Sequence, residues 1–203
     1  MHVVPTVPSV LLASASPRRS ELLRQIGVAH EVRPVHVDES PLPGEAPAAY
    51  VLRLAERKAA ALRRGLGSAD PRPVLAADTT VALDGRIFGK PGGAPELHEM
   101  LGALSGRTHQ VHTAVAVLHA GGASARVSTS DVSLRPLTRD EIDWYWSTGE
   151  PADKAGGYAV QGRAAVFIRH ISGSYSGVMG LPLYETWELL APVLGPTAGS
   201  GAP

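Results

Sequence analysis

The sequence has no cysteine, and aromatic residues make up only 5% of its 203 residues. The lack of cysteine excludes disulfide bonds, thiolate metal sites and cysteine nucleophiles, and it suits a reducing compartment. Lysine plus arginine number 19, as do aspartate plus glutamate, so the formal net charge is zero. A balanced surface gives no electrostatic reason to expect nucleic acid or an anionic membrane as a partner. Any site for an anion must therefore be local.

Long apolar runs are also missing, because no stretch approaches the roughly 18 residues that a membrane span requires. The apolar segment Val3–Ala15 ends in an Ala-Ser-Ala tripeptide that resembles a signal-peptidase site. No lysine or arginine precedes it, however, and Pro5 and Pro8 interrupt it, which argues against a signal peptide. We therefore expect a soluble protein of the cytoplasm, with no membrane partner.

The pattern of hydrophobic residues predicts strands that alternate with helices, which is typical of an α/β domain with a mixed sheet. We expect strands over 9–13, 31–37, 74–77, 81–83, 86–88, 108–119, 125–134 and 164–168, and helices over 17–26, 48–64, 96–104, 138–146 and from 182 onward. Asp84-Gly85 predicts a hairpin, and Thr138 with Glu141 predicts a capping box. The expected domain covers 1–195, and the tail 196–203 is expected to be disordered.

The segment from Ser14 to Arg19 lies where a predicted strand ends and a predicted helix begins. Such a junction directs free backbone N–H groups and the positive end of the helix to one point, and Arg18 and Arg19 can pair with phosphate oxygens. The alternative is an ordinary helix start at Ser16, followed by two solvated arginines. The local features alone do not decide between them.

Two acidic residues follow predicted strands: Asp78 follows 74–77, and Glu39 lies just beyond 31–37. Ligands of α/β sheets collect at the carboxyl ends of strands, where a carboxylate can hold a divalent cation or orient a water molecule. Each residue could equally be an acidic group in an ordinary turn.

Two lysines are candidates for contact with an anion. Lys58 lies on the apolar face of the helix 48–64, where it must either extend to solvent or meet an anion. Lys90 follows the predicted hairpin in Gly89-Lys90-Pro91, which cannot be a P-loop because the glycine spacing and the residue after lysine differ from that motif. His109 and His112 lie on opposite faces of one predicted strand, so we interpret both as structural.

Taken together, two arginines, two lysines and two carboxylates at the ends of predicted elements suit a polyphosphate bound with a divalent cation. The sequence also resembles the Maf-like nucleotide pyrophosphatases, which are also called septum-formation inhibitors. The matching segments are LLASASPRRSELL (11–23), Glu39, RLAERKAAA around Lys58, AADTTVALDGRIFGKP (76–91), LSGRTHQVHTAVAV (104–117), GEPADKAGGYAVQG (149–162) and ISGSYSGVMGLPLYET (171–186).

The resemblance implies a mixed, bent sheet with two lobes around a central cleft, similar to inosine-triphosphate pyrophosphatases. It implies hydrolysis between the α and β phosphates of a nucleoside triphosphate, with Mg²⁺ or Mn²⁺ as the expected cation. Glu39 and Asp78 are then the metal ligands, with Asp78 as the base. The implied phosphate-binding residues are Ser14, Arg18, Arg19, Lys58 and Lys90. A homodimer is left open beside a monomer.

The resemblance is greatest to the branch that prefers dTTP and UTP, because Arg18, Thr79 and Gln161 match that branch. The Gln161 amide can pair with the O4 and N3–H edge of uracil or thymine, provided that Thr79 or a backbone group orients it. Gly177 departs from relatives that often carry a larger residue. The alternatives are a pyrophosphatase for purine or methylated-guanine triphosphates and a nucleotide-binding regulator of septum formation without turnover.

Overall fold

The computed structural model describes residues 10–66 and 70–194, and within these ranges seven strands form one sheet. Its strand order is β2-β1-β3-β5-β6-β7, and β4 pairs with β3 outside this path. The pairs β1–β2 and β1–β3 are parallel and the others are antiparallel, which confirms the predicted mixed α/β class. The predicted disordered tail 196–203 lies outside the described residues.

The strands are β1 (Val10–Leu12), β2 (His30–Val32), β3 (Val74–Leu83), β4 (Arg86–Phe88), β5 (Thr108–His119), β6 (Gly122–Leu134) and β7 (Ile168–Ser172). The helices are α1 (Pro17–Gln25), α2 (Pro47–Leu66), α3 (Ala94–Leu104), α4 (Arg139–Ser147), α5 (Tyr175–Met179) and α6 (Leu183–Leu194). Three 3₁₀ turns, η1 (Glu150–Asp153), η2 (Ala155–Gly157) and η3 (Arg163–Phe167), lie between α4 and β7. Among all the described residues, no helix is long and apolar enough to cross a membrane.

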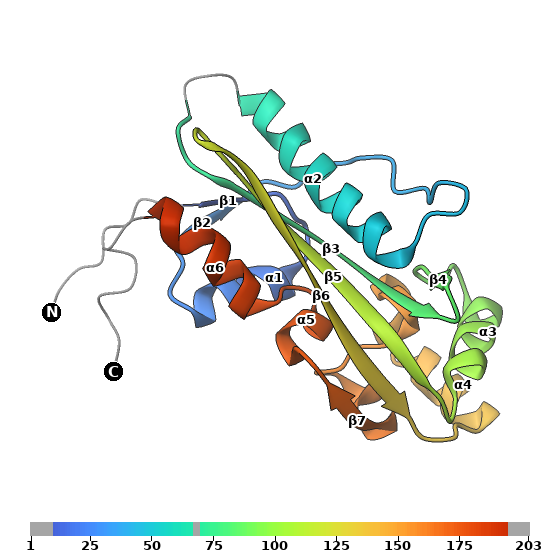
Figure 1. Cartoon of the computed structure of the whole chain (residues 1–203). Helices are drawn as coiled ribbons and strands as arrows, with labels where there is room; N and C mark the ends of the chain where they lie inside the picture. The colour runs from blue at the N-terminus through green and yellow to red at the C-terminus, as the bar shows by residue number, and fades with distance from the viewer. Residues whose placement is uncertain (1–9, 67–69, 195–203) are drawn as a thin grey trace, which may run out of the picture.

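One long helix covers one face of the sheet, and the remaining helices pack on the other (Figure 1). The helix α2 presents Val51, Ala55 and Ala59 to the sheet, where it meets small residues such as Ala76 and Ala114. Alanines on both sides let the helix lie close to the strands, so buried groups on α2 reach β3 directly.

The opposite face of the sheet carries two separate cores. One packs Leu75 and Val115 against α1 and α6, and the other packs Val81 and Val111 against α3 and α4. Between them the same face of β3 and β5 carries polar Thr79 and Thr113, which belong to neither core. This polar interruption separates the two cores.

Several predicted elements are confirmed by the structure. The strand β5 has the predicted bounds, and Thr138 and Glu141 form the predicted capping box at the start of α4. The hairpin turn places Asp84 at φ 53° and Gly85 at φ 79°, which is the left-handed conformation that a two-residue turn requires.

Two predicted strands are wrong. The strand predicted over 31–37 ends at Val32, because its partner β1 ends at Leu12, where the Ser14 N–H bonds back to the Leu12 carbonyl. The strand predicted over 164–168 is the 3₁₀ turn η3, and strand β7 begins only at Ile168. The short helix α5, which the sequence did not predict, begins where the Ser174 hydroxyl accepts the N–H of Gly177.

Candidate active site

A cleft opens where the edge of the sheet is interrupted. On one side of β3, β1 pairs with Val74 and Leu75, whereas β4 pairs with the segment Val81–Leu83. Between these contacts, residues 77–80 pair only with β5 on the other side. The cavity beside this free edge has a volume of about 550 Å³, and both Asp78 and Thr79 line it.

Asp78 therefore lies in the middle of a strand, which corrects its predicted place at a strand end. The strand continues to Leu83, since Thr79, Thr80 and Val81 are β-branched residues that favour extended backbone. Successive side chains point to opposite faces, so Asp78 faces α2 while Thr79 faces α5. Both reach the cleft only because no strand covers this part of the edge.

Asp78, Lys58 and Glu39 form a compact charged cluster. The Lys58 Nζ atom lies 2.6 Å from Asp78 Oδ1 and 2.6 Å from Glu39 Oε1. Lys58 is buried, with 9% of its surface exposed, as is Asp78 with 7%. Of the two alternatives for Lys58, the structure shows contact with anions, and these anions are the protein's own carboxylates.

Glu39 follows no strand, because residues 33–46 form an irregular loop. This loop is nevertheless anchored to α2. The Tyr50 hydroxyl donates to the carbonyl of Glu39 at 2.9 Å, and Arg53 donates to the carbonyl of Ser40 at 3.1 Å. Arg53 also pairs with both carboxylate oxygens of Glu45, at 2.5 and 2.6 Å. The helix α2 thus provides Lys58 and also positions the carboxylate that Lys58 contacts.

The two carboxylates differ in proton affinity. Burial raises the pKa of Asp78 above its usual range, although the nearby charges of Lys58 and Arg19 oppose the rise. Burial also acts to raise the pKa of Glu39, but its hydrogen bond with Lys58 and the positive charges around it lower this pKa overall. Asp78 is consequently the better proton acceptor of the pair, and Glu39 stays ionised.

The turn before α1 is held together by Arg19. Its guanidinium donates to Ser14 Oγ at 3.1 Å, to Thr79 Oγ1 at 3.2 Å and to the carbonyl of Gly180 at 2.8 Å. Ser14 Oγ also accepts the backbone N–H of Ser16 at 3.1 Å. Arg19 therefore joins the β1–α1 turn to β3 and α5, which is a structural role that the sequence did not reveal.

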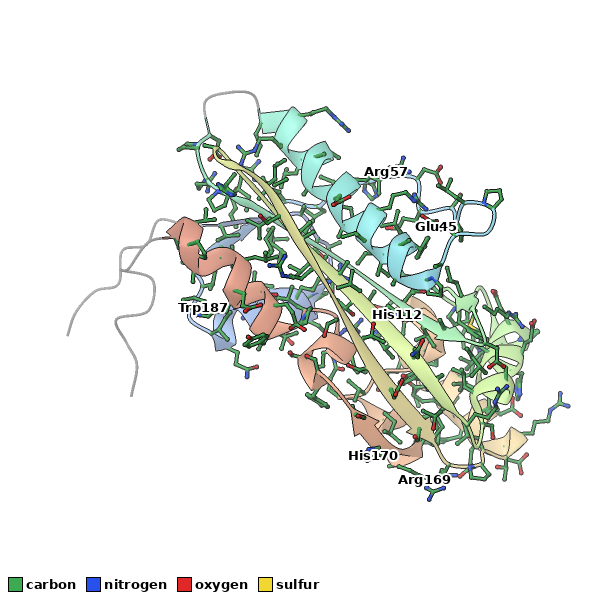
Figure 2. The ribbon with its side chains drawn as sticks, in the orientation of Figure 1. Glu45, Arg57, His112, Arg169, His170 and Trp187 are labelled. Atoms are coloured by element: carbon green, nitrogen blue, oxygen red, sulfur yellow. The ribbon has the colours of Figure 1, made fainter. Side chains whose placement is uncertain are left out.

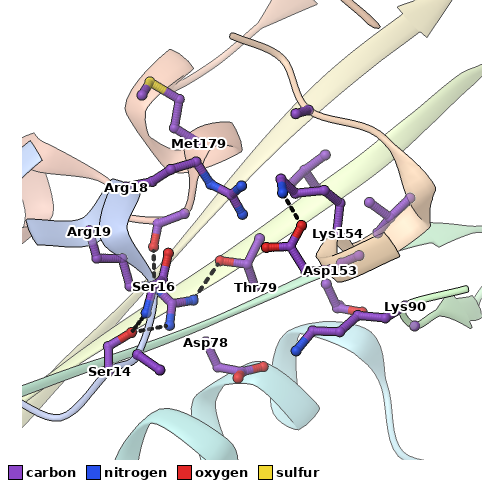
Figure 3. A pocket seen from close by; sticks show the side chains of 18 of the residues that line it. Ser14, Ser16, Arg18, Arg19, Asp78, Thr79, Lys90, Asp153, Lys154 and Met179 are labelled. Atoms are coloured by element: carbon purple, nitrogen blue, oxygen red, sulfur yellow. Dashed lines mark hydrogen bonds and ion pairs between the residues drawn. The ribbon is translucent and has the colours of Figure 1, made fainter. Parts of the chain in front are cut away.

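Arg18 differs from Arg19 because it makes no hydrogen bond or ion pair within the described residues. It lines the cleft, and Figure 3 shows its side chain pointing across toward Asp153 and Lys154. Its guanidinium is free to pair with an incoming anion, as the phosphate interpretation of this turn requires.

Three further cations line the cleft: Arg18, Lys90 and Lys154 (Figure 3). Lys154 pairs with Asp153, and sequence reasoning assigned a role to neither residue. They lie within the segment 149–162, whose match to relatives was the only available indication. Burial acts to raise the pKa of Asp153, but the contact with Lys154 lowers it overall, so Asp153 is ionised.

Known proteins are similar to this chain over most of its length. The family model described as Maf-like protein matches residues 9–193. The chain belongs to the Maf-like family. It is 50% identical to the dTTP/UTP pyrophosphatase of Nitrosomonas europaea over 198 residues, covering 93% of this chain and 96% of that protein. It is 53% identical to the dTTP/UTP pyrophosphatase of Methylobacillus flagellatus, covering 89% and 90%. The solved structure of the Staphylococcus aureus Ham1 protein covers 62% of this chain and 71% of its own, at 16% identity and a TM-score of 0.42.

In this Maf-like protein the loop 149–164 and α5 also line the cleft, and the loop forms one of its walls. Gln161 is exposed and lines the cavity, close in sequence to the apolar residues Tyr158 and Val160 that line it too. The loop packs closely through glycine, since a Cβ on Gly157 would lie 2.3 Å from Leu97 and φ is 71° there. No hydrogen bond joins Thr79 to Gln161, because the Thr79 hydroxyl contacts Arg19 and Thr113 instead.

The two histidines of β5 are buried, as their structural interpretation requires. His109 Nε2 lies 2.7 Å from the hydroxyl of Tyr158, and burial lowers the pKa of His109 to about 4. His112 lies on the opposite face of β5 (Figure 2), with Nδ1 3.0 Å from Thr129 Oγ1. His112 shares the α2 face of the sheet with Asp78 but bonds to Thr129, whereas His109 supports Tyr158, which lines the cleft.

Proposed function

We propose that this Maf-like protein hydrolyses dTTP and UTP, and related pyrimidine triphosphates, to the monophosphate and pyrophosphate. The observation that carries the proposal is the buried Lys58 ammonium shared between Asp78 and Glu39, directly beside the free edge of β3. The cations Arg18, Lys90 and Lys154 across the same cleft suit the negative charge of a triphosphate. The relatives named as dTTP/UTP pyrophosphatases support the substrate class.

The donor set fits a divalent cation that is bound together with its substrate. Glu39 and Asp78 provide hard carboxylate oxygens, and the described residues contain no group of three or more acidic, histidine or cysteine side chains that could hold a metal alone. Mg²⁺ and Mn²⁺ commonly bind through one or two carboxylates, with phosphate oxygens and water completing the shell. When bound, such a cation would lower the pKa of its water and offset charge on the phosphates.

The residues of the protein would then have separate roles in proton transfer and phosphate binding. Asp78, with its raised pKa, accepts the proton of the attacking water. Lys58 uses two of its three N–H donors on carboxylates, which leaves the third for a phosphate oxygen. Arg18 and Lys90 hold the pyrophosphate that leaves, while Ser14 and Arg19 shape the turn against which the phosphates lie.

The decisive experiment is an incubation of the purified protein with UTP and Mg²⁺ or Mn²⁺. We expect UMP and pyrophosphate, and no turnover after chelation of the metal. Formation of UDP and orthophosphate would show that the wrong bond was assigned. Nucleotide binding without turnover would favour the non-catalytic regulator, and faster turnover of GTP or methylated GTP would favour the purine alternative.

The metal proposal has a test of its own that does not depend on turnover. Because the charged cluster offers two carboxylates and Lys58 contacts both, we expect Mn²⁺ alone to bind weakly in titration calorimetry. A non-hydrolysable UTP analogue with a methylene between the α and β phosphates should strengthen that binding. Tight Mn²⁺ binding without nucleotide would contradict this arrangement. We also predict that the protein is located in the cytoplasm, which a localisation measurement would test. Whether it forms a homodimer can be tested by sedimentation.

A further inference from the structure

The loop that carries Gln161 is held by a carboxylate outside the charged cluster. Glu150 begins η1, and its carboxylate accepts the Tyr145 hydroxyl at 2.7 Å and the backbone N–H of Arg163 at 3.0 Å. The N–H of Ala164 lies 3.5 Å from the same group. The carboxylate therefore attaches the chain just after Gln161 to the end of α4.

Tyr145, on α4, binds the backbone of the chain just before Gln161. Its hydroxyl accepts the backbone N–H of Ala159 at 3.2 Å while donating to Glu150. The Tyr145 ring is fully buried and packs edge-on against Phe167, with ring centroids 5.5 Å apart and planes at 89°. Tyr145 is thus a rigid support, and one phenol and one carboxylate hold both sides of Gln161.

Gly162 shows how closely the carboxylate approaches the loop. A Cβ at this position would lie 2.2 to 2.5 Å from the three carboxylate atoms of Glu150. The backbone of Gly162, at φ −102° and ψ −156°, is extended and open to other residues. Glycine is therefore required here for the approach of Glu150 and not for an unusual backbone angle.

Glu150 carries its charge without a cation in contact. Within the described residues its hydrogen-bond donors are the Tyr145 hydroxyl and backbone N–H groups. Burial acts to raise the pKa of Glu150, but these donors lower it overall, so the carboxylate stays ionised. Hydrogen bonds to a charged acceptor are stronger than neutral ones, which makes this attachment firm.

We propose that Glu150 and Tyr145 are positioning residues that present Gln161 to the base and thereby set the selectivity for uracil and thymine over cytosine. The proposal rests on the proposed function. The Gln161 side chain makes no hydrogen bond within the described residues, so its position depends on the backbone that Tyr145 and Glu150 hold. A glutamine amide that shifts or rotates can serve cytosine as well as uracil, and selectivity is then lost.

The experiment compares Tyr145→Phe and Glu150→Gln with the wild type on UTP and CTP. We expect kcat/KM for UTP to fall roughly tenfold, mainly through KM, which corresponds to one lost hydrogen bond to a charged group. The value for CTP should fall less, so the UTP to CTP ratio decreases, while inhibition by pyrophosphate is unchanged. The matched control is Tyr184→Phe, which also removes a hydroxyl bonded to a glutamate, at an exposed place on α6.

If Tyr145 and Glu150 had a purely structural role, their variants would lose kcat/KM equally for UTP and CTP. Equal losses in variants with the melting temperature of the wild type would overturn the proposal. A double variant with Gln161→Ala gives a second criterion, because Tyr145→Phe should then change the ratio no further. Gly162→Ala provides an independent route, since its added methyl conflicts with Glu150 and should reproduce the loss of selectivity. If the wild type itself does not hydrolyse UTP, the proposed function is wrong. Equal losses of kcat/KM for UTP and CTP in the variants would instead contradict only the positioning role.

Discussion

The two walls of the cleft are built in different ways. The charged wall consists of Glu39, Lys58 and Asp78, which are joined by ion pairs between side chains of a loop, a helix and a strand. The loop wall is the segment 149–164 with Gln161, which is held by backbone N–H groups, a phenol and a single carboxylate. Charge organises the first wall, whereas directional hydrogen bonds and the small volume of glycine organise the second.

This difference indicates what each wall can distinguish. Every nucleoside triphosphate has the same phosphates, so the charged wall suits chemistry that is common to all of them. The bases differ in their pattern of donors and acceptors, which only an oriented hydrogen-bonding group can read. Changes in the charged wall should therefore affect all substrates, and changes in the loop wall should affect their ranking.

The largest effect is expected from Asp78→Asn, which keeps the shape of the charged wall but removes the proton acceptor. Turnover should fall at least ~10²-fold for every nucleotide, the lower range for a positioned acid–base group. The control is Asp84→Asn, at an exposed turn position with φ 53° that asparagine tolerates well. A folded Asp78→Asn protein with near-normal turnover would remove Asp78 from the mechanism.

An intermediate effect is expected from Arg18→Ala, because this guanidinium is free while Arg19 is already engaged. Loss of a charged hydrogen bond to phosphate should cost about 1.5 to 3 kcal/mol in kcat/KM for UTP. Pyrophosphate inhibition should weaken in parallel, and the melting temperature should stay constant. Arg24→Ala, at an exposed position on the same helix, is the matched control. Equal behaviour of the two variants would favour an ordinary surface role for Arg18.

The smallest effect is expected from Gln161→Ala in the loop wall. We expect kcat/KM for UTP and dTTP to fall roughly tenfold, about 1.4 kcal/mol, with little change for CTP and GTP. The gap between uracil and cytosine would then narrow. Gln25→Ala, at the exposed end of α1, controls for the general effect of removing an amide. Equal losses for all nucleotides would mean that Gln161 only braces its loop.

Much of the secondary structure was predictable because its indicators are local. Pro17 at the start of a helix, the capping box of Thr138 and Glu141, and the Asp84-Gly85 turn each depend on a few neighbouring residues. The apolar face of α2 marked Lys58 as a residue that must extend to solvent or meet an anion, and the structure shows the second. The same local segments also resembled the family to which the chain belongs.

The errors arose where distant segments decide the outcome. Asp78 was placed at a strand end because 74–77 is a short apolar run, whereas pairing with β5 extends β3 to Leu83. Glu39 was placed after a strand, although Tyr50 and Arg53 position its loop from α2. The structural role of Arg19 depends on Gly180, 161 residues away, which no local pattern indicates.

The sequence by itself determined the chemical groups: the carboxylates, the cations, and the helices and turns that carry them. Only the tertiary structure decided that Asp78 and Thr79, which point to opposite faces of β3, both reach one cleft. The reason is that β1 and β4 leave residues 77–80 uncovered, and this gap depends on where two other strands end. Helix periodicity and turn conformation act over a few residues, but the edge of a sheet is set by pairing between segments far apart in the chain.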